Sequence, residues 1–125
     1  VSGRERMYFD YYWNDFAANP NRSLSQTDRD AYVAAYARPG RMAAGWAYFG
    51  SFPQTAGDFA KLAGTKLRIP VLSIGGAHAN GTALGVQARL ISDNVTVVVL
   101  ENTGHWLIDE NPAETIAILT QFLES

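Results

Sequence analysis

Histidine has the widest chemical scope among the side chains of this sequence, and the chain contains only two, His78 and His105. His105 follows Gly104 in the segment ENTGHWLIDENP, between an apolar run at 95–102 and an amphipathic run at 112–125. A histidine in a loop at the end of a strand can act as a general base, because the sheet holds the loop in place. The alternative is a polar residue in a solvent-exposed loop, where polar residues are common. The residue alone does not separate these two interpretations.

The neighbouring side chains give weaker patterns. We expect Asp109 and Glu110 to face solvent or, for Asp109, to cap the helix that begins at Pro112. Trp106 is predicted to be a packing residue that fixes the loop. His78 follows a glycine pair and is predicted to be a surface loop residue.

The composition narrows the classes of protein that fit. The chain has 125 residues, enough for one domain, and 47% of them are hydrophobic, enough for a packed core. A net charge of −2 without a basic run makes nucleic acid and acidic membrane surfaces poor partners. No apolar stretch reaches the roughly 20 residues of a membrane helix, and VSGRERMYF lacks a signal-peptide layout. We expect a soluble protein, with the cytoplasm favoured. The absence of cysteine excludes disulfides, and two histidines argue against a metal cluster, so we expect no metal or cofactor.

Residues 1–65 have the period and punctuation of helices. Four helices are expected, over residues 5–19, 25–37, 41–52 and 56–66. The first two open with the spacing of a capping box, Ser2 with Glu5 and Ser25 with Asp28. Gly45 is expected to interrupt the third helix. The first carries a wide aromatic face, which predicts burial against something large.

Residues 66–125 change period. Two apolar runs, 67–76 and 95–102, predict strands buried on both faces, and 82–92 and 112–125 predict helices after them. Strand, helix, strand, helix indicates a parallel α/β sheet. Because two parallel strands make a poor sheet, we expect them to be the end of a larger one.

Together these motifs resemble a known family. KLRIPVLSIGG and NVTVVVLENTGHWLIDENPAETIAILTQFL look like the last two strand–helix units of an α/β-hydrolase, where G-H-W/F…E-x-P…F-L is common. AYARPGRMAAGWAYFGSF is similar to the lid of the epoxide-hydrolase and dehalogenase-like branch, where Y-A-x-P-G-x-M-x-A-G-F-x-Y-Y-R recurs. The resemblance implies an incomplete α/β fold, with a helical cap (lid) segment at 1–65 and the C-terminal part of the core at 66–125.

The resemblance also implies a reaction. In this branch an aspartate attacks the substrate carbon to form an ester, and the histidine of the G-H pair activates the water that hydrolyses it. His105 would be that general base. No G-x-S-x-G or G-x-D-x-G elbow occurs in the chain, so the nucleophile would lie outside it. We therefore expect a C-terminal fragment that is inactive alone. Ala77 stands where relatives often carry the carboxylate that orients the histidine, so no orienting acid is assigned.

Related epoxide hydrolases use a lid tyrosine in the Y-Y-R segment to donate a hydrogen bond to the opening epoxide. Here the segment reads Tyr48-Phe49-Gly50, and direct alignment places the donor position at Phe49. Tyr48 is the candidate substrate-binding residue, but it reaches that position only with a shift of one residue, about 100° around a helix. Packing within the lid is the alternative role for Tyr48. A small apolar substrate is expected.

Two other hypotheses remain open. The chain could be truncated or degenerate and act, if at all, by association. It could also be an unrelated small α/β binding domain, although this leaves the joint match of lid and histidine loop unexplained. In each case the first strand has an unpaired edge, which we expect to pair with the missing N-terminal segment or with another copy of the chain.

Overall fold

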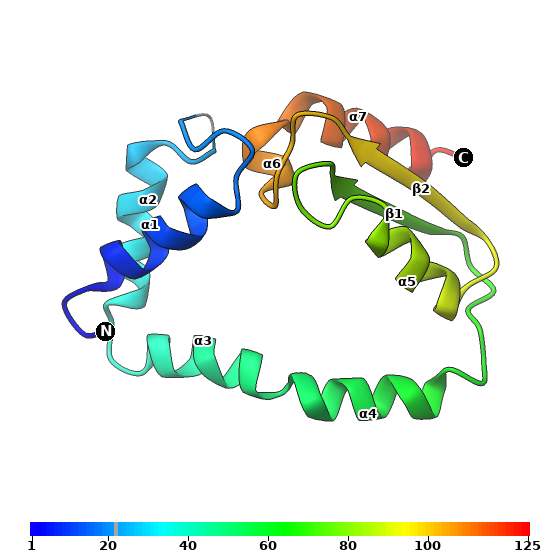
Figure 1. Cartoon of the computed structure of the whole chain (residues 1–125), viewed down its shortest axis with the longest axis horizontal. Coiled ribbons are helices and arrows are strands. Elements are labelled where there is room, and N and C mark those ends of the chain that lie inside the picture. Colours follow the sequence, from blue (N-terminus) through cyan, green and yellow to red (C-terminus); the bar gives the residue numbers. More distant parts are fainter. Residues whose placement is uncertain (22) are drawn as a thin grey trace.

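The computed structural model describes residues 1–21 and 23–125, in which four helices precede a pair of parallel strands and their flanking helices (Figure 1). The elements are α1 (Glu5–Asp15), α2 (Gln26–Tyr36), α3 (Arg41–Gly50), α4 (Phe52–Leu62), β1 (Val71–Gly76), α5 (Ala83–Ile91), β2 (Val95–Leu100), α6 (Leu107–Glu110) and α7 (Pro112–Leu123). The predicted order of four helices followed by strand, helix, strand and helix is confirmed, with the short α6 as an addition.

The two predicted capping boxes have different outcomes. Ser25 caps α2, because its hydroxyl accepts the Asp28 N–H at 3.2 Å and lies 2.5 Å from the Asp28 carboxylate. The first box is wrong. Gly3 takes a φ of +74° and turns the chain before α1, so its own N–H, rather than that of Ser2, meets the Glu5 carboxylate at 3.1 Å.

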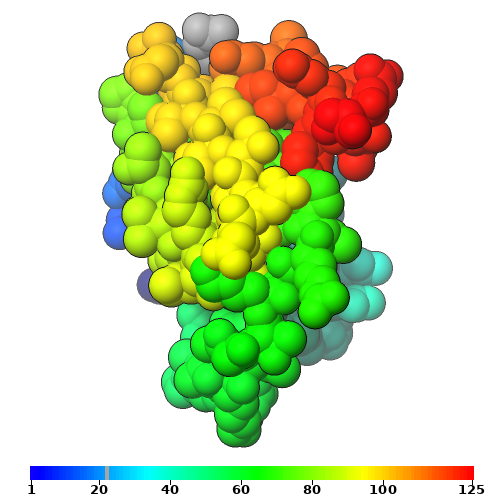
Figure 2. Space-filling model, turned by 90° about the vertical axis from the view of Figure 1, so that its right-hand side faces the viewer, coloured from blue at the N-terminus to red at the C-terminus, as the bar shows by residue number. Residues whose placement is uncertain are grey.

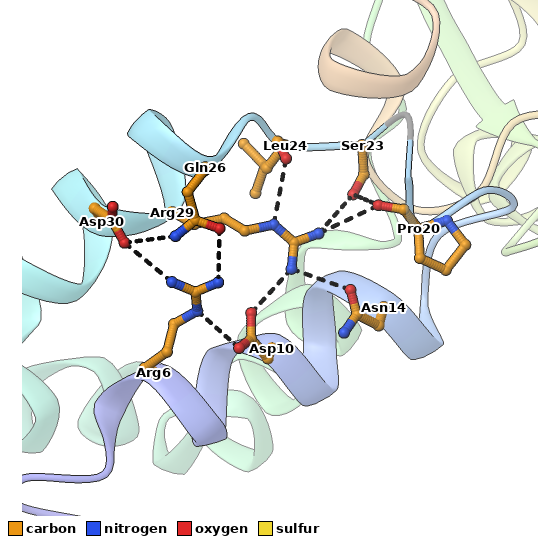
Figure 3. A network of polar contacts seen from close by, with 9 residues as sticks. All are labelled: Arg6, Asp10, Asn14, Pro20, Ser23, Leu24, Gln26, Arg29 and Asp30. Atoms are coloured by element: carbon orange, nitrogen blue, oxygen red, sulfur yellow. Dashed lines mark hydrogen bonds and ion pairs between the residues drawn. The ribbon is translucent and has the colours of Figure 1, made fainter.

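A buried arginine joins α1 to α2. The Arg29 guanidinium donates to Asp10 at 2.9 Å and to Asn14 at 3.0 Å, both on α1 (Figure 3). It also donates to the Ser23 hydroxyl and to the carbonyls of Pro20 and Leu24 in the connecting segment. The planar fork of arginine, with five N–H groups, suits so many acceptors at once. These bonds fix α1 relative to α2.

Helices α3 and α4 run one after the other, away from the strands (Figure 1). Gly45 does not interrupt α3, and Pro53 in the first turn of α4 starts that helix earlier than predicted. Neither helix contains a buried residue. In the space-filling view, the green segment that includes α4 projects below the yellow and red strand-bearing half (Figure 2).

The strands pair in parallel, from Val71 opposite Val95 to Gly76 opposite Leu100, as predicted. Helix α5 packs on both strands from one side and α7 lies across the other (Figure 1). The prediction that both strands are buried on both faces is wrong. Most β2 side chains are half-buried and Leu100 alone is fully enclosed, because a sheet of two strands leaves both edges uncovered. This is an incomplete α/β fold.

The accessible surface shows the same incompleteness. It measures 8735 Å² for a chain of 13.7 kDa. A compact monomer of that mass exposes about 6,600 Å². Among the described residues, Trp13 and Leu100 are the buried hydrophobic side chains. None of the described helices combines the length and the apolar character that a membrane span needs.

Candidate functional site

The histidine loop leaves the C-terminal end of β2 and turns at once. Asn102 adopts a left-handed conformation with φ 53°, which asparagine tolerates better than most residues. His105 follows with an exposed side chain, and its backbone N–H donates to the Phe16 carbonyl at 2.8 Å. The predicted loop histidine therefore lies at the carboxyl end of the sheet, tied to the residues that follow α1.

Position 104, directly before His105, has no room for a side chain. A Cβ atom on Gly104 would lie 2.4 Å from the Ala18 nitrogen and 2.5 Å from the Phe16 oxygen. At the end of β1, a Cβ on Gly76 would lie 2.1 Å from the Gly104 oxygen. Backbone atoms cannot rotate away as side chains do, so both glycines are needed for the loop to fit between β1 and the end of α1.

Glu110 holds this loop from within. Its side chain is buried, and its carboxylate accepts hydrogen bonds from the N–H groups of Ala18 at 2.7 Å, Gly104 at 3.1 Å and Trp106 at 3.0 Å. The prediction that Glu110 faces solvent or caps a helix is wrong. Because α6 forms after the histidine, Glu110 lies one turn beyond Trp106 and points back to the loop.

Asp109 follows the first of its two predicted alternatives, because its side chain is exposed. It does not cap α7, since Asn111 stands at that helix start without a side-chain capping bond. Its carboxylate lies at the edge of an aromatic cavity. Partial burial there, followed by the nearby charges of Asp28 and Glu110, raises the pKa of Asp109 above its usual value.

Two neighbouring cavities open beside the loop. The first, of about 430 Å³, contains His105 in its wall. It is lined by Tyr12, Phe16, Phe49, Ala79, Asn80, His105 and Trp106. The second, of about 290 Å³, shares Tyr12, Phe49 and Trp106 with the first and is lined chiefly by aromatic side chains of α1 and α2. An apolar enclosure with a few polar groups is typical of a small-molecule site.

Comparison with known proteins supports the resemblance of this chain to part of an α/β-hydrolase. No protein-family model matches the chain. It is 31% identical over 103 residues, 80% of its length, to Epoxide hydrolase A of Mycobacterium tuberculosis, and spans about a third (32%) of that relative. Among solved structures, it superposes on the epoxide hydrolase CorEH with a TM-score of 0.92 and 26% identity, covering 99% of this chain and 44% of that one. For Cfl2 from Burkholderia cenocepacia the TM-score is 0.89, with 27% identity and coverage of 98% and 42%.

The chain corresponds to part of an epoxide-hydrolase-like α/β-hydrolase. The family resemblance seen in the sequence is thereby confirmed. The assignment of residues 1–65 to a lid stays a prediction. The comparisons concern the fold and family and do not test the individual site residues.

Within this hydrolase fold, the structure separates the two residues considered for the lid donor. Tyr48 is 67% exposed and packs its ring against Phe49 and Phe52, outside the two cavities. Phe49 lines both cavities. Tyr12, which the sequence did not single out, also lines both, and its hydroxyl lies 3.5 Å from that of Tyr8. The substrate-binding role of Tyr48 stays a prediction.

The imidazole of His105 is held among aromatic rings. Its centroid lies 4.8 Å from the Trp106 ring, edge to face, and 6.0 Å from Phe16. Among the described residues, no carboxylate bonds to the imidazole, and Ala77 follows β1 where such an acid was sought. His78 is exposed in its loop, as predicted. The described part of the chain holds no cluster of three or more metal-ligating side chains.

Proposed function

We propose that this chain supplies the water-activating base and the aromatic substrate pocket of an epoxide-hydrolase-like enzyme. The observation that carries the proposal is the position of His105, which lies at the carboxyl end of β2 and opens on a cavity of about 430 Å³ lined by lid aromatics. The enclosure fits a small apolar substrate. Reactive groups at this end of a parallel sheet are usual in open α/β folds.

In the proposed reaction, a carboxylate nucleophile from another part of the enzyme attacks a carbon of the epoxide. The carbon–oxygen bond of the ring breaks, and the departing oxygen takes a proton from a hydroxyl donor. His105 then removes a proton from water, and the hydroxide attacks the ester carbonyl. The ester carbon–oxygen bond breaks, the departing alkoxide takes the proton from the His105 imidazolium to give the diol, and the carboxylic acid returns its proton to the hydroxyl donor. The base and the pocket come from this chain in the proposal, whereas the nucleophile and the orienting acid come from elsewhere.

Tyr12 is the hydroxyl that the geometry favours as the proton donor. It lines the same cavity as His105. The pKa of Tyr12 is raised above its usual value by the hydrogen bond with the Tyr8 hydroxyl, then by the Coulombic effect of Tyr8, burial and the Coulombic effect of Tyr11. Tyr48 is 67% exposed and lines neither cavity, which argues against it in this role.

We also propose that the uncovered sheet edges and apolar surface pack against further strands and helices of an α/β-hydrolase core. The chain exposes about 2,100 Å² more than a compact monomer of its mass, an area in the range of permanent interfaces. A second copy of the chain is the competing occupant. Sedimentation of the purified chain distinguishes the two, because self-association would favour the second copy. A cooperatively melting monomer at low concentration would contradict both.

The functional test uses this chain joined to, or expressed with, a segment that carries the missing elbow. We expect epoxide hydrolysis that His105→Ala abolishes and His78→Ala, the matched control on the other exposed histidine, leaves within twofold. His105→Ala should also accumulate a covalent ester, seen as one substrate mass added to the nucleophile-bearing segment. Hydrolysis that survives His105→Ala would refute the role of the base. A folded assembly without turnover would favour a non-catalytic chain that acts by association.

A further inference from the structure

The Glu110 carboxylate lies where three parts of the chain meet. One oxygen, Oε2, accepts the N–H groups of Ala18 at 2.7 Å and Gly104 at 3.1 Å, and the other, Oε1, accepts that of Trp106 at 3.0 Å. The residue is only 8% exposed, so little water can reach these bonds or replace them. Hydrogen bonds to a carboxylate are shorter and stronger than those between neutral groups.

Two of these N–H groups flank His105. Gly104 and Trp106 are its immediate neighbours, so one side chain holds the Thr103–Gly104 and His105–Trp106 peptide groups, while the Phe16 carbonyl holds the peptide N–H of His105 between them. This restricts the backbone dihedrals of His105 and with them the direction in which its imidazole projects into the cavity.

The third bond extends this restraint to the helical segment. Ala18 follows α1, and two residues earlier the Phe16 carbonyl accepts the His105 N–H at 2.8 Å. Tyr12 on α1 lines the same cavity as His105. Glu110 thus ties the histidine loop to the helix that provides part of the substrate enclosure.

We propose that Glu110 is the positioning residue of His105, fixing the imidazole relative to the lid without touching the substrate. The inference rests on the proposed function of His105, but its geometry can be tested without catalysis. Glu110→Gln is the sharpest substitution, because the amide keeps one acceptor oxygen and turns an N–H₂ group toward a backbone donor. The change removes at least one bond while the side chain keeps its size.

The first experiment follows the two imidazole ring resonances of the whole chain by NMR. We expect Glu110→Gln to shift and broaden the His105 resonance while the His78 resonance, an internal control in a separate loop, stays in place. Glu101→Gln is the matched control, since it removes the same charge from an exposed side chain close to the loop. An unmoved His105 resonance, or equal changes at both histidines, would overturn the positioning role.

A second measurement uses the unmodified chain, so that it does not depend on the variant folding. In hydrogen exchange followed by NMR, the amides of Ala18, Gly104 and Trp106 should share one protection factor, because a single opening at the carboxylate frees all three. Unrelated protection factors would show that the carboxylate does not hold these groups together.

The third measurement is made in the assembled enzyme. Misplacement of a base slows the chemical step more than it weakens substrate binding, so we expect Glu110→Gln to lower kcat about 10- to 100-fold with KM within twofold. An equal rise in KM without loss of kcat would contradict positioning. If His105→Ala leaves turnover intact, the proposed function fails, whereas the two NMR results would still decide the structural link from Glu110 to His105.

Discussion

Replacing Gly104 by alanine tests whether the histidine loop is held against the end of α1. The added Cβ would lie 2.4 Å from the Ala18 nitrogen, 2.5 Å from the Phe16 oxygen and 2.8 Å from the Ala17 carbonyl carbon. Ordinary contacts to a Cβ begin near 3.4 Å, so the two backbone segments must separate by about 1 Å. The segment at 16–18 must then move away from the loop.

The cost has two parts. Forcing an extra methyl into a closely packed site costs about 1–3 kcal/mol. Separation also stretches the bond from the His105 N–H to the Phe16 carbonyl, 2.8 Å long, whose loss costs about 0.5–1.5 kcal/mol. The free energy of local opening should therefore fall by about 1.5–4.5 kcal/mol, equivalent to a roughly 12- to 1,600-fold rise in exchange rate at about 1.4 kcal/mol per tenfold.

Amide hydrogen exchange measures this directly at His105 and Ala18. We expect both amides in Gly104→Ala to exchange faster by that factor, or to lose all protection if the wild-type opening free energy is smaller. Gly57→Ala is the control, because Gly57 lies within α4 with no atom within 4 Å of the added Cβ, and alanine there should stabilise the helix by about 0.5–1 kcal/mol. Unchanged exchange at His105 and Ala18 in Gly104→Ala would refute the close approach.

Three further predictions concern the helical segment and the cavities. Arg29→Lys should lower the free energy of unfolding by about 1–3 kcal/mol in denaturant titrations, because lysine cannot reproduce the five-acceptor fork, whereas exposed Arg38→Lys should change it by less than about 0.5 kcal/mol. Partial burial raises the pKa of Asp109, so between pH 3.8 and the folded pKa the folded chain still holds the Asp109 proton that the unfolded chain has lost. The free energy of unfolding of the wild type therefore falls as pH rises through this range. Asp109→Asn should therefore be the more stable protein at neutral pH, by no more than about 0.5 kcal/mol, with no advantage below that window; an advantage confined to acid pH would contradict the assignment. In the assembled enzyme Tyr12→Phe should lower kcat by about 10²-fold and Tyr48→Phe by less than twofold, and the reverse order would return the donor role to Tyr48.

All the named elements except α6 could be predicted, because each of the others has a local signal. The β-branched run at 95–100 and the helical spacing after Pro112 are readable within one segment. Local signals also mislead where two sites share one pattern. Ser25 and Ser2 both stand three residues before an acid, but only Ser25 caps its helix. At Ser2 the positive φ of Gly3 turns the chain, and the spacing of the two residues does not reveal this turn.

The loop position of His105 after β2 could be predicted, but the groups that hold this loop in place could not. His105 carries a family motif, whereas Glu110 looked like one of several acids before a helix. Its partners are backbone N–H groups, one of them from Ala18, and backbone groups have no sequence signature of their own. Knowing that a short helix would form at 107–110 and turn Glu110 inward would have identified it.

The disagreement between the strand sequences and their burial is itself informative. An almost wholly apolar strand is the pattern of burial on both faces, yet Val97, Val98 and Val99 are only half-buried. The same discrepancy appears in the accessible surface, about 2,100 Å² larger than a compact chain of this mass would show. The proposed neighbouring strands and helices of a hydrolase core would account for both discrepancies. Such neighbours should slow the exchange of the β1 and β2 amides at the sheet edges, whereas a partner that docked only on α1 to α4 would leave them unprotected.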